Sequence, residues 1–271
     1  MNMDSFLQTH EATVRIVCFF SLFAAVALWE VLAPRRRLTA SKSVRWLNNL
    51  GLVALNTVVI RVLFPMGTVG VTLFAMNQGW GLLNHWELPF WLATTLAIIV
   101  MDLVIWAQHV LFHFVPVLWR LHRVHHADPD YDLTTGARFH TIEIILSLLI
   151  KFGVILVLGP PITAVILFEV ILNGMAIFNH ANARLPLPLD RILRLFVVTP
   201  DMHRVHHSVE NDELNSNFGF NLSCWDRLFG TYREQPHTGH LDMDIGICSY
   251  RTPEEVSWLP GLLILPFRAN K

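Results

Sequence analysis

Long apolar runs separated by short polar segments dominate the first two thirds of the chain. Five runs have the length of membrane helices, at residues 14–33, 50–76, 90–114, 142–158 and 162–178. A helix of about 20 residues crosses a hydrocarbon core of about 30 Å. The second run contains Arg61 and the sequence Pro65-Met66-Gly67, so it is either one kinked crossing or a broken helix. The pattern predicts an all-α fold, a polytopic membrane helical bundle with about five spans.

Basic residues after the first run predict the orientation of this bundle. Arg35, Arg36, Arg37, Lys42 and Arg45 follow that run closely, and an excess of Lys and Arg marks cytoplasmic loops. The segment before the run has acidic but no basic residues, which argues against a cleaved signal peptide. With five crossings, the N-terminus lies outside, and residues 114–141 and 179–271 face the cytoplasm.

Composition narrows the class of protein. Of the 271 residues, 53% are hydrophobic and only 15% are charged, whereas soluble domains have roughly a quarter of charged residues. The net charge of -1 provides no basic field for nucleic acid. Three cysteines without metal-type spacing support neither a disulfide framework nor a thiolate zinc site. The unusual residue is histidine, with 14 copies.

Eight of these histidines form three motifs. They are His109-Val-Leu-Phe-His113, His122-Arg-Val-His125-His126 and His203-Arg-Val-His206-His207. Residues at i, i+3 and i+4 share a helix face, so each motif directs its imidazoles to one side. Neutral imidazole is a good ligand for iron, zinc, copper or nickel. Eight converging rings exceed what one ion can bind, so the number predicts two metal ions in a cytosolic, histidine-rich cap.

Other metal chemistries fit this pattern less well. The HExxH signature of zinc hydrolases is absent. Bis-histidine haem ligation would use only two rings per haem. A metal transporter would place its ligands near the middle of the spans, whereas these motifs stand at their cytoplasmic ends.

The order of the motifs, with a transmembrane hairpin before the last, resembles the fatty acid hydroxylase superfamily, also called the sterol desaturase family. Further segments fit it, and they are Leu118–His122, Gly136–His140 with Glu143, Asn179–Asn182, Thr199–His203, Asn217–Gly219 and Trp225–Tyr232. The resemblance divides the chain into N-terminal spans (residues 1–89), a catalytic domain (90–232) and a C-terminal cytosolic tail (233–271).

The resemblance implies a di-iron centre that activates dioxygen, the co-substrate, against a C–H bond of a lipid. Carried over to this chain, the metal ligands are the eight motif histidines and two more. They are His109, His113, His122, His125, His126, His140, His180, His203, His206 and His207.

Residues outside the ligand set lead to further expectations. The remaining histidines are expected at the surface, and they are His10, His85, His237 and His240. The acids Asp128, Asp130, Glu143 and Asp201 are candidates to orient ligand N–H groups, with plain solvation favoured for Asp128 and Asp130. Asp102, deep in the third span, is a candidate partner of a metal ligand or of Arg61, or part of a buried structural pair. Arg123 and Arg204 lie off the ligand face and are expected at the cytosolic surface or against a donor protein.

The leading functional interpretation is an integral-membrane di-iron oxidoreductase that hydroxylates or desaturates a sterol, fatty acyl or related lipid. Electrons are expected from a separate cytochrome b-type or ferredoxin-type protein with its reductase, because the chain has no flavin or haem domain and no iron–sulfur motif. Alternatives are an ether-lipid monooxygenase, a carotenoid hydroxylase, or a metal-binding membrane protein without turnover. The bacterial inner membrane is favoured over the endoplasmic reticulum.

Overall fold

The five apolar runs all form helices in the computed structural model, which describes residues 3–269. The long helices are α1 (Met3–Leu32), α2 (Lys42–Leu63), α3 (Gly67–Asn77), α4 (Phe90–Phe114), α6 (Thr141–Leu158) and α7 (Ile162–Asn179). Five segments are long and apolar enough to cross a membrane, and α2 with α3 counts as one of them. Within the described residues there is no β-strand. The predicted all-α bundle of an integral membrane protein is therefore confirmed.

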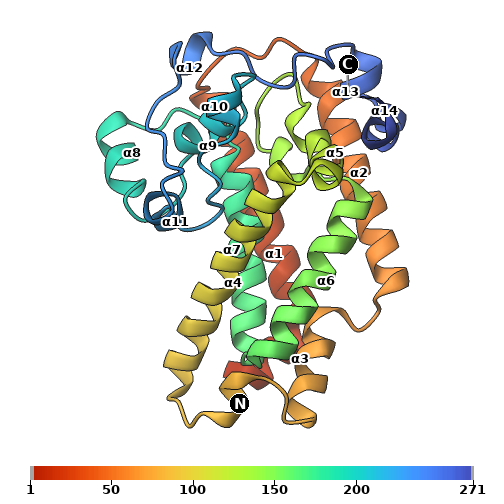
Figure 1. Ribbon diagram of the computed structural model, residues 1–271, viewed down its shortest axis with the longest axis vertical. Helices are drawn as coiled ribbons and strands as arrows, with labels where there is room; N and C mark the ends of the chain where they lie inside the picture. The colour runs from red at the N-terminus through yellow and green to blue at the C-terminus, as the bar shows by residue number, and fades with distance from the viewer. Residues whose placement is uncertain (1–2, 270–271) are drawn as a thin grey trace.

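Short helices form a cap at one end of this bundle (Figure 1). They are α5 (Pro116–His126), η2 (Thr135–Ala137), α8 (Leu187–Leu193), α9 (Pro200–His206), α10 (Asn211–Leu214), α11 (Cys224–Leu228), α12 (Gly239–Asp242), α13 (Pro253–Val256), α14 (Leu259–Ile264) and η3 (Leu265–Phe267), while η1 (Leu82–His85) lies at the opposite end. Both histidine-bearing stretches that follow the spans lie in or beside the cap, at the same end of the bundle.

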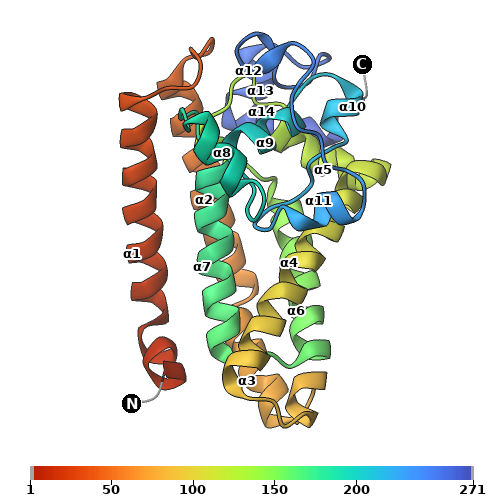
Figure 2. The same cartoon turned by 90° about the vertical axis from the view of Figure 1, so that its left-hand side faces the viewer.

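The second run is a broken helix. Pro65 has no N–H to continue the ladder of α2, and Gly67 has φ 59°, a left-handed conformation that favours glycine. The chain resumes as α3, which packs on α6 and α7 at the far end of the bundle (Figure 2). Helix α6 ends similarly at Gly159, whose φ is 63° and which precedes two prolines. The turn at Gly159 reverses the chain between α6 and α7, whereas after the break at Pro65 the chain continues to the far end of the bundle as α3 (Figure 1).

The helices differ in how much of their surface the protein encloses. Helix α7 is the most enclosed, and α1, which packs along it, has its other sides open (Figure 2). Large apolar side chains such as Phe20, Val62, Trp91 and Val157 are exposed on the spans. Exposed apolar surface on long helices is the face that lipid covers.

A buried ion network connects the start of α2 to the cap. Arg45, which is fully buried, donates to Asp128 at 2.6 and 2.8 Å and to Asp132 at 2.5 Å. Asp130 is also buried and accepts from the backbone N–H groups of Thr39 and Ala40. The expectation that Asp128 and Asp130 are solvated was therefore wrong, because partners about 85 residues away in sequence enclose them.

Residues 233–269 pack against the rest of the cap. Tyr250, Val256, Leu262 and Leu265 form an apolar core with Val124 of α5 and with α2. This core thus attaches the C-terminal segment to both α5 and α2.

Candidate metal centre

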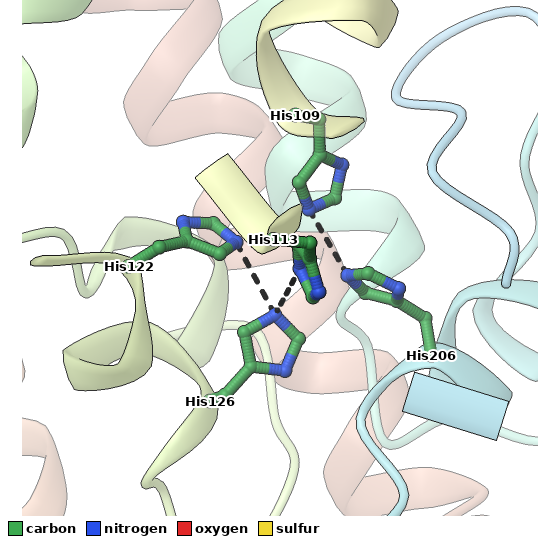
Figure 3. A group of neighbouring side chains, drawn as sticks. All are labelled: His109, His113, His122, His126 and His206. Atoms are coloured by element: carbon green, nitrogen blue, oxygen red, sulfur yellow. Dashed lines mark hydrogen bonds between the residues drawn. The ribbon is translucent and has the colours of Figure 1, made fainter. Parts of the chain in front are cut away.

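Five histidines from three helices converge at the cap end of α4. His109 and His113 occupy the last turns of α4, and Pro116 begins α5 after a short reversal of the chain. The five-histidine group consists of His109, His113, His122, His126 and His206. Figure 3 shows their ring nitrogens directed toward a common centre.

Four more histidines form a second group beside the first. The four-histidine group consists of His125, His180, His203 and His207. The rings of His126 and His207, one from each group, are stacked with centroids 4.5 Å apart. The structure thus brings together nine of the ten predicted ligands, in two adjacent groups.

Each copy of the repeated pentapeptide serves both groups. In α5, His122 and His126 enter the five-histidine group and His125 the other, whereas α9 and its C-cap give His206 to the first and His203 and His207 to the second. The i and i+4 rings share one direction, and the i+3 ring diverges to the side. The prediction that all three rings of a pentapeptide face one way therefore holds for the i and i+4 rings and is wrong for the i+3 ring.

Burial keeps these rings neutral. Burial lowers the pKa of His122 and of His180 to about 3. Burial and then neighbouring imidazoles hold the pKa well below its usual value in five more, namely His125, His126, His203, His206 and His207. A neutral imidazole has one nitrogen lone pair free to bind a metal.

Protein acceptors fix the tautomer of four rings. The Nδ1–H groups of His109, His206 and His180 donate to the carbonyl oxygens of Phe218, Ser216 and Ala176 at 2.7–2.8 Å. His122 Nδ1 donates to Glu143 Oε1 at 2.6 Å, as expected for an acid that orients a ligand. In each case Nε2 remains free to face the group's centre.

Asn217 positions two of these carbonyls. Among the described non-glycine residues, it alone has a positive φ, of 50°. Its side chain donates to Met202 O and Arg233 O and accepts from Arg233 N–H. The resulting turn directs the carbonyls on either side of Asn217 toward the rings of His206 and His109, a role that the sequence motif alone does not indicate.

The donor sets fit metal ions. A metal–nitrogen bond of about 2.1 Å places two cis ligands about 3.0 Å apart. The Nε2 atoms of His109 and His206 are 3.0 Å apart, and those of His113 and His126, and of His125 and His180, are 3.2 Å apart. Both nitrogens of His203 and of His207 are buried without a hydrogen-bond partner among the described residues. Unpaired buried acceptors are costly, and a metal ion would satisfy them.

His140 lies outside both groups, so its expected ligand role lacks support from the geometry. It is the N-cap of α6, where Nδ1 accepts from Ile142 N–H at 3.2 Å. Nε2 then donates to Leu263 O at 3.3 Å. Both ring nitrogens of His140 are thus used in hydrogen bonds to the backbone.

Of the four histidines expected at the surface, three are exposed and His240 is buried. His240 Nε2 lies 3.7 Å from Asp201. Asp201 pairs with Arg35 at 3.0 Å and with Arg204, rather than with a ligand histidine. Its expected orienting role is replaced by an ion network that joins α9 to the loop after α1.

The surface role expected of Arg123 and Arg204 was wrong. Both are buried. Arg123 donates to Leu265 O and Arg268 O in the C-terminal segment. Arg204 binds Asp201 and Ala181 O and lies over the ring of Tyr131. The side of each motif opposite the histidines is covered by other parts of the cap.

Asp102 also has partners that the sequence did not indicate. It accepts from Asn221 Nδ2, Trp225 Nε1 and the N–H of Leu222 at 2.7–3.2 Å. The suggested pairing with Arg61 was therefore wrong. Asp102 attaches the loop before α11 to the middle of α4, which is the structural role considered for it.

A cavity of about 500 Å³ leads from the histidines into the bundle. His109, His122 and His125 line one end. Apolar residues including Phe112 and Phe139 line its walls between α2, α4, α6 and α7. The histidine groups are thus accessible from within the membrane-spanning part of the protein.

Comparison with known proteins identifies the family. The fatty acid hydroxylase family model matches residues 94–231. Ornithine lipid hydroxylase OlsE of Rhizobium tropici is 26% identical over 239 residues, which cover 84% of this chain and 70% of that protein. Alkylglycerol monooxygenase of Xenopus tropicalis is 30% identical, covering 68% of this chain and 41% of its own length. Cholesterol 25-hydroxylase of Rattus norvegicus is 26% identical, covering 54% and 48%.

The chain spans less than half the length of the last two relatives. No solved structure gives a significant match. The matched family region covers about half of the chain and contains every histidine of both groups. The chain therefore belongs to the fatty acid hydroxylase family.

Proposed function

We propose that this protein is a membrane di-iron oxidoreductase that uses dioxygen to hydroxylate or desaturate a lipid. The observation that carries the proposal is the pair of adjacent histidine groups at the end of a cavity inside the membrane bundle. The relatives described as hydroxylases and monooxygenases support the reaction class.

The five-histidine group would hold one iron and the four-histidine group the other. Two irons bound in this way supply the means to activate dioxygen against an unactivated C–H bond. Neutral imidazoles leave the positive charge of the metals uncompensated, in contrast to a carboxylate-rich site. Glu143, the carbonyls of Phe218 and Ser216, and that of Ala176 hold four rings in the tautomer that presents Nε2.

The cavity would orient the substrate. Its apolar walls accept hydrocarbon, and entry from the bundle keeps the reacting carbon out of bulk water. The C–H bond to be oxidised would lie at the end lined by His109, His122 and His125. Residues 90–232 would then form the catalytic part of the chain.

We further propose that the histidine groups lie on the cytoplasmic side of the membrane and receive electrons from a separate protein. The basic loop after α1 lies at the cap end and pairs with α9, and by the positive-inside rule this supports a cytoplasmic position for the histidine groups. A separate electron-donor protein would dock on the exposed face of the cap. A location in the bacterial inner membrane is supported by the match to a bacterial hydroxylase, which covers 84% of this chain.

The test uses the full chain purified in lipid nanodiscs and loaded anaerobically with ferrous iron. We expect about two irons per chain, and dioxygen uptake that requires both a reductant and a lipid extract. Mass spectrometry of the extract should show one lipid class gaining an oxygen atom or losing two hydrogens.

His206→Ala should abolish oxidation and lower the iron content, whereas the matched change of an exposed ring, His237→Ala, should leave both unchanged. Full oxidation by His206→Ala would contradict the dinuclear site. Two irons without dioxygen uptake in any lipid extract would favour a metal-binding protein without turnover.

A further inference from the structure

A layer of charged side chains lies within the membrane-spanning part of the bundle, at the end of the cavity away from the histidines. Arg15 of α1, Arg61 of α2 and Lys151 of α6 line this cavity together with His109 and His122. A basic residue inside a membrane span is costly unless something compensates its charge. Each of these three cations is therefore expected to have a negatively charged or polar partner.

Two of the three cations share a carboxylate of the protein. Glu169 of α7 lies 2.6 Å from Arg15 and 2.8 Å from Lys151, and it also accepts from Thr68 Oγ1 at 2.9 Å. Arg15 has a second partner in Glu11 at 2.9 Å. Both oxygens of Glu169 are thus already used, and this network joins α1, α3, α6 and α7.

Arg61 is different. Within residues 3–269 it takes part in none of the ion pairs or hydrogen bonds that hold its neighbours. Because Arg15 and Lys151 are matched against Glu11 and Glu169, the charge of Arg61 is the excess in this layer. Thr57, one helical turn before Arg61 on α2, and Asn173, one turn after Glu169 on α7, also line the cavity, so polar side chains lie near Arg61 that could accompany a bound polar group.

The distance between the two ends follows from helix geometry. Glu143, which contacts His122, and Lys151 are eight residues apart on α6, which is a rise of about 12 Å. Val53 and Arg61 line the cavity along α2 with the same separation. Helices α2 and α6 pack side by side (Figure 1), so both separations describe the same length of the cavity along the bundle.

We propose that Arg61 binds the anionic group of the lipid substrate, a carboxylate or a phosphate ester, about 12 Å along the bundle from the level of Glu143 at the histidine end of the cavity. The proposal rests on the proposed function, because it assigns the bound lipid as the substrate. A lipid held in this way would be oxidised on its hydrocarbon part, remote from its charged end. Guanidinium is suited to the task because it pairs with carboxylate or phosphate through two parallel hydrogen bonds.

The test measures binding without turnover, so that it can fail separately from the oxidation chemistry. The full-length protein, with its metal but no reductant, is placed in nanodiscs of zwitterionic lipid. Three radiolabelled probes of equal chain length are compared at equilibrium: an alkyl phosphate, an alkanoate and an alkanol. We expect at least one anionic probe to bind about tenfold more tightly than the alkanol, with the tighter anion identifying the phosphate or the carboxylate source.

Arg61→Gln should remove this preference by weakening the anionic probes about tenfold while alkanol binding stays unchanged. Arg61→Lys, which keeps the charge, should retain most of it. Arg191→Gln makes the same charge change on an exposed position of α8 and serves as the matched control.

Equal affinity of the wild-type protein for all three probes would overturn the proposal, as would an unchanged preference in Arg61→Gln. A selective anion site in a protein that consumes no dioxygen would support the binding site and contradict only the proposed function.

Discussion

Glu143 gives the most direct test of whether the protein orients His122 for binding a metal ion. Its Oε1 accepts from His122 Nδ1 at 2.6 Å, and both side chains are buried. A hydrogen bond to an ionised acceptor contributes about 1.5–3 kcal/mol, and a neutral one about 0.5–1.5 kcal/mol. Removing the acceptor with Glu143→Leu should therefore weaken metal binding roughly 10- to 100-fold, since about 1.4 kcal/mol is one factor of ten. Glu143→Gln keeps a neutral acceptor and should lose only about fivefold, for a difference of about 1 kcal/mol.

The assay is anaerobic competition for ferrous iron between the protein and a coloured chelator, with thermal unfolding of the metal-free protein measured in parallel. Metal affinity is the better readout because Glu143 also lines the cavity, so turnover would mix two effects. Glu87→Gln, in an exposed loop at the far end of the bundle, is the matched control. A Glu143→Leu protein that binds iron with wild-type affinity would refute the orienting role.

Three more predictions follow from the buried network, the turn between the carbonyls and the neutral rings. Arg45→Met leaves buried carboxylates without a counter-charge and should destabilise the protein by about 3–5 kcal/mol in chemical unfolding, whereas the exposed Arg37→Met should not; equal stability of both would contradict the network's role. Asn217→Gly keeps the left-handed conformation but loses the side-chain contacts, and Asn217→Ala loses both, so iron affinity should fall in the order wild type, Gly, Ala; an Ala variant better than Gly would exclude backbone conformation as the cause. Burial lowers the pKa of His122 and His180 to about 3, against about 6.5 in an unfolded chain, so the unfolded chain takes up protons first as the pH falls. The melting temperature of the metal-free protein should therefore be highest above about pH 6.5 and decrease steadily from there toward pH 4; a flat profile would contradict the buried neutral state.

The spans and the grouping of the motif histidines were predictable because their signals are local. Apolar runs of membrane length and histidines at i, i+3 and i+4 each identify themselves within one helix. The broken second span was left open, because Pro65-Met66-Gly67 fits either a kink or a break. The ligand role of His140 rested on the resemblance alone, and the structure places this residue at the start of α6 as a cap, outside both histidine groups.

Residues whose partners are distant in sequence could not be placed. A helix position tells which face a side chain occupies but not what covers that face. Arg123 and Arg204 lie off the ligand face as expected, yet the C-terminal segment and the loop after α7 cover them. The same reason applies to Arg45 and Asp102, whose partners are more than 80 residues away.

The division of each pentapeptide between the two groups has a consequence for metal loading. His125 belongs to the four-histidine group, but its neighbours His122 and His126 on the same helix belong to the other. Its ring stacks on Phe139 at 4.4 Å and lies 3.2 Å from His180 through Nε2, so its loss frees one side of α5. Because α5 is a rigid element, a shift at His125 moves rings of both groups. His125→Ala should therefore lower the iron content by more than one ion per chain. Iron titrations monitored by Mössbauer spectroscopy should show weaker binding in both histidine groups. One fully occupied, unperturbed iron in that variant would show that the two groups bind independently, despite the helix that they share.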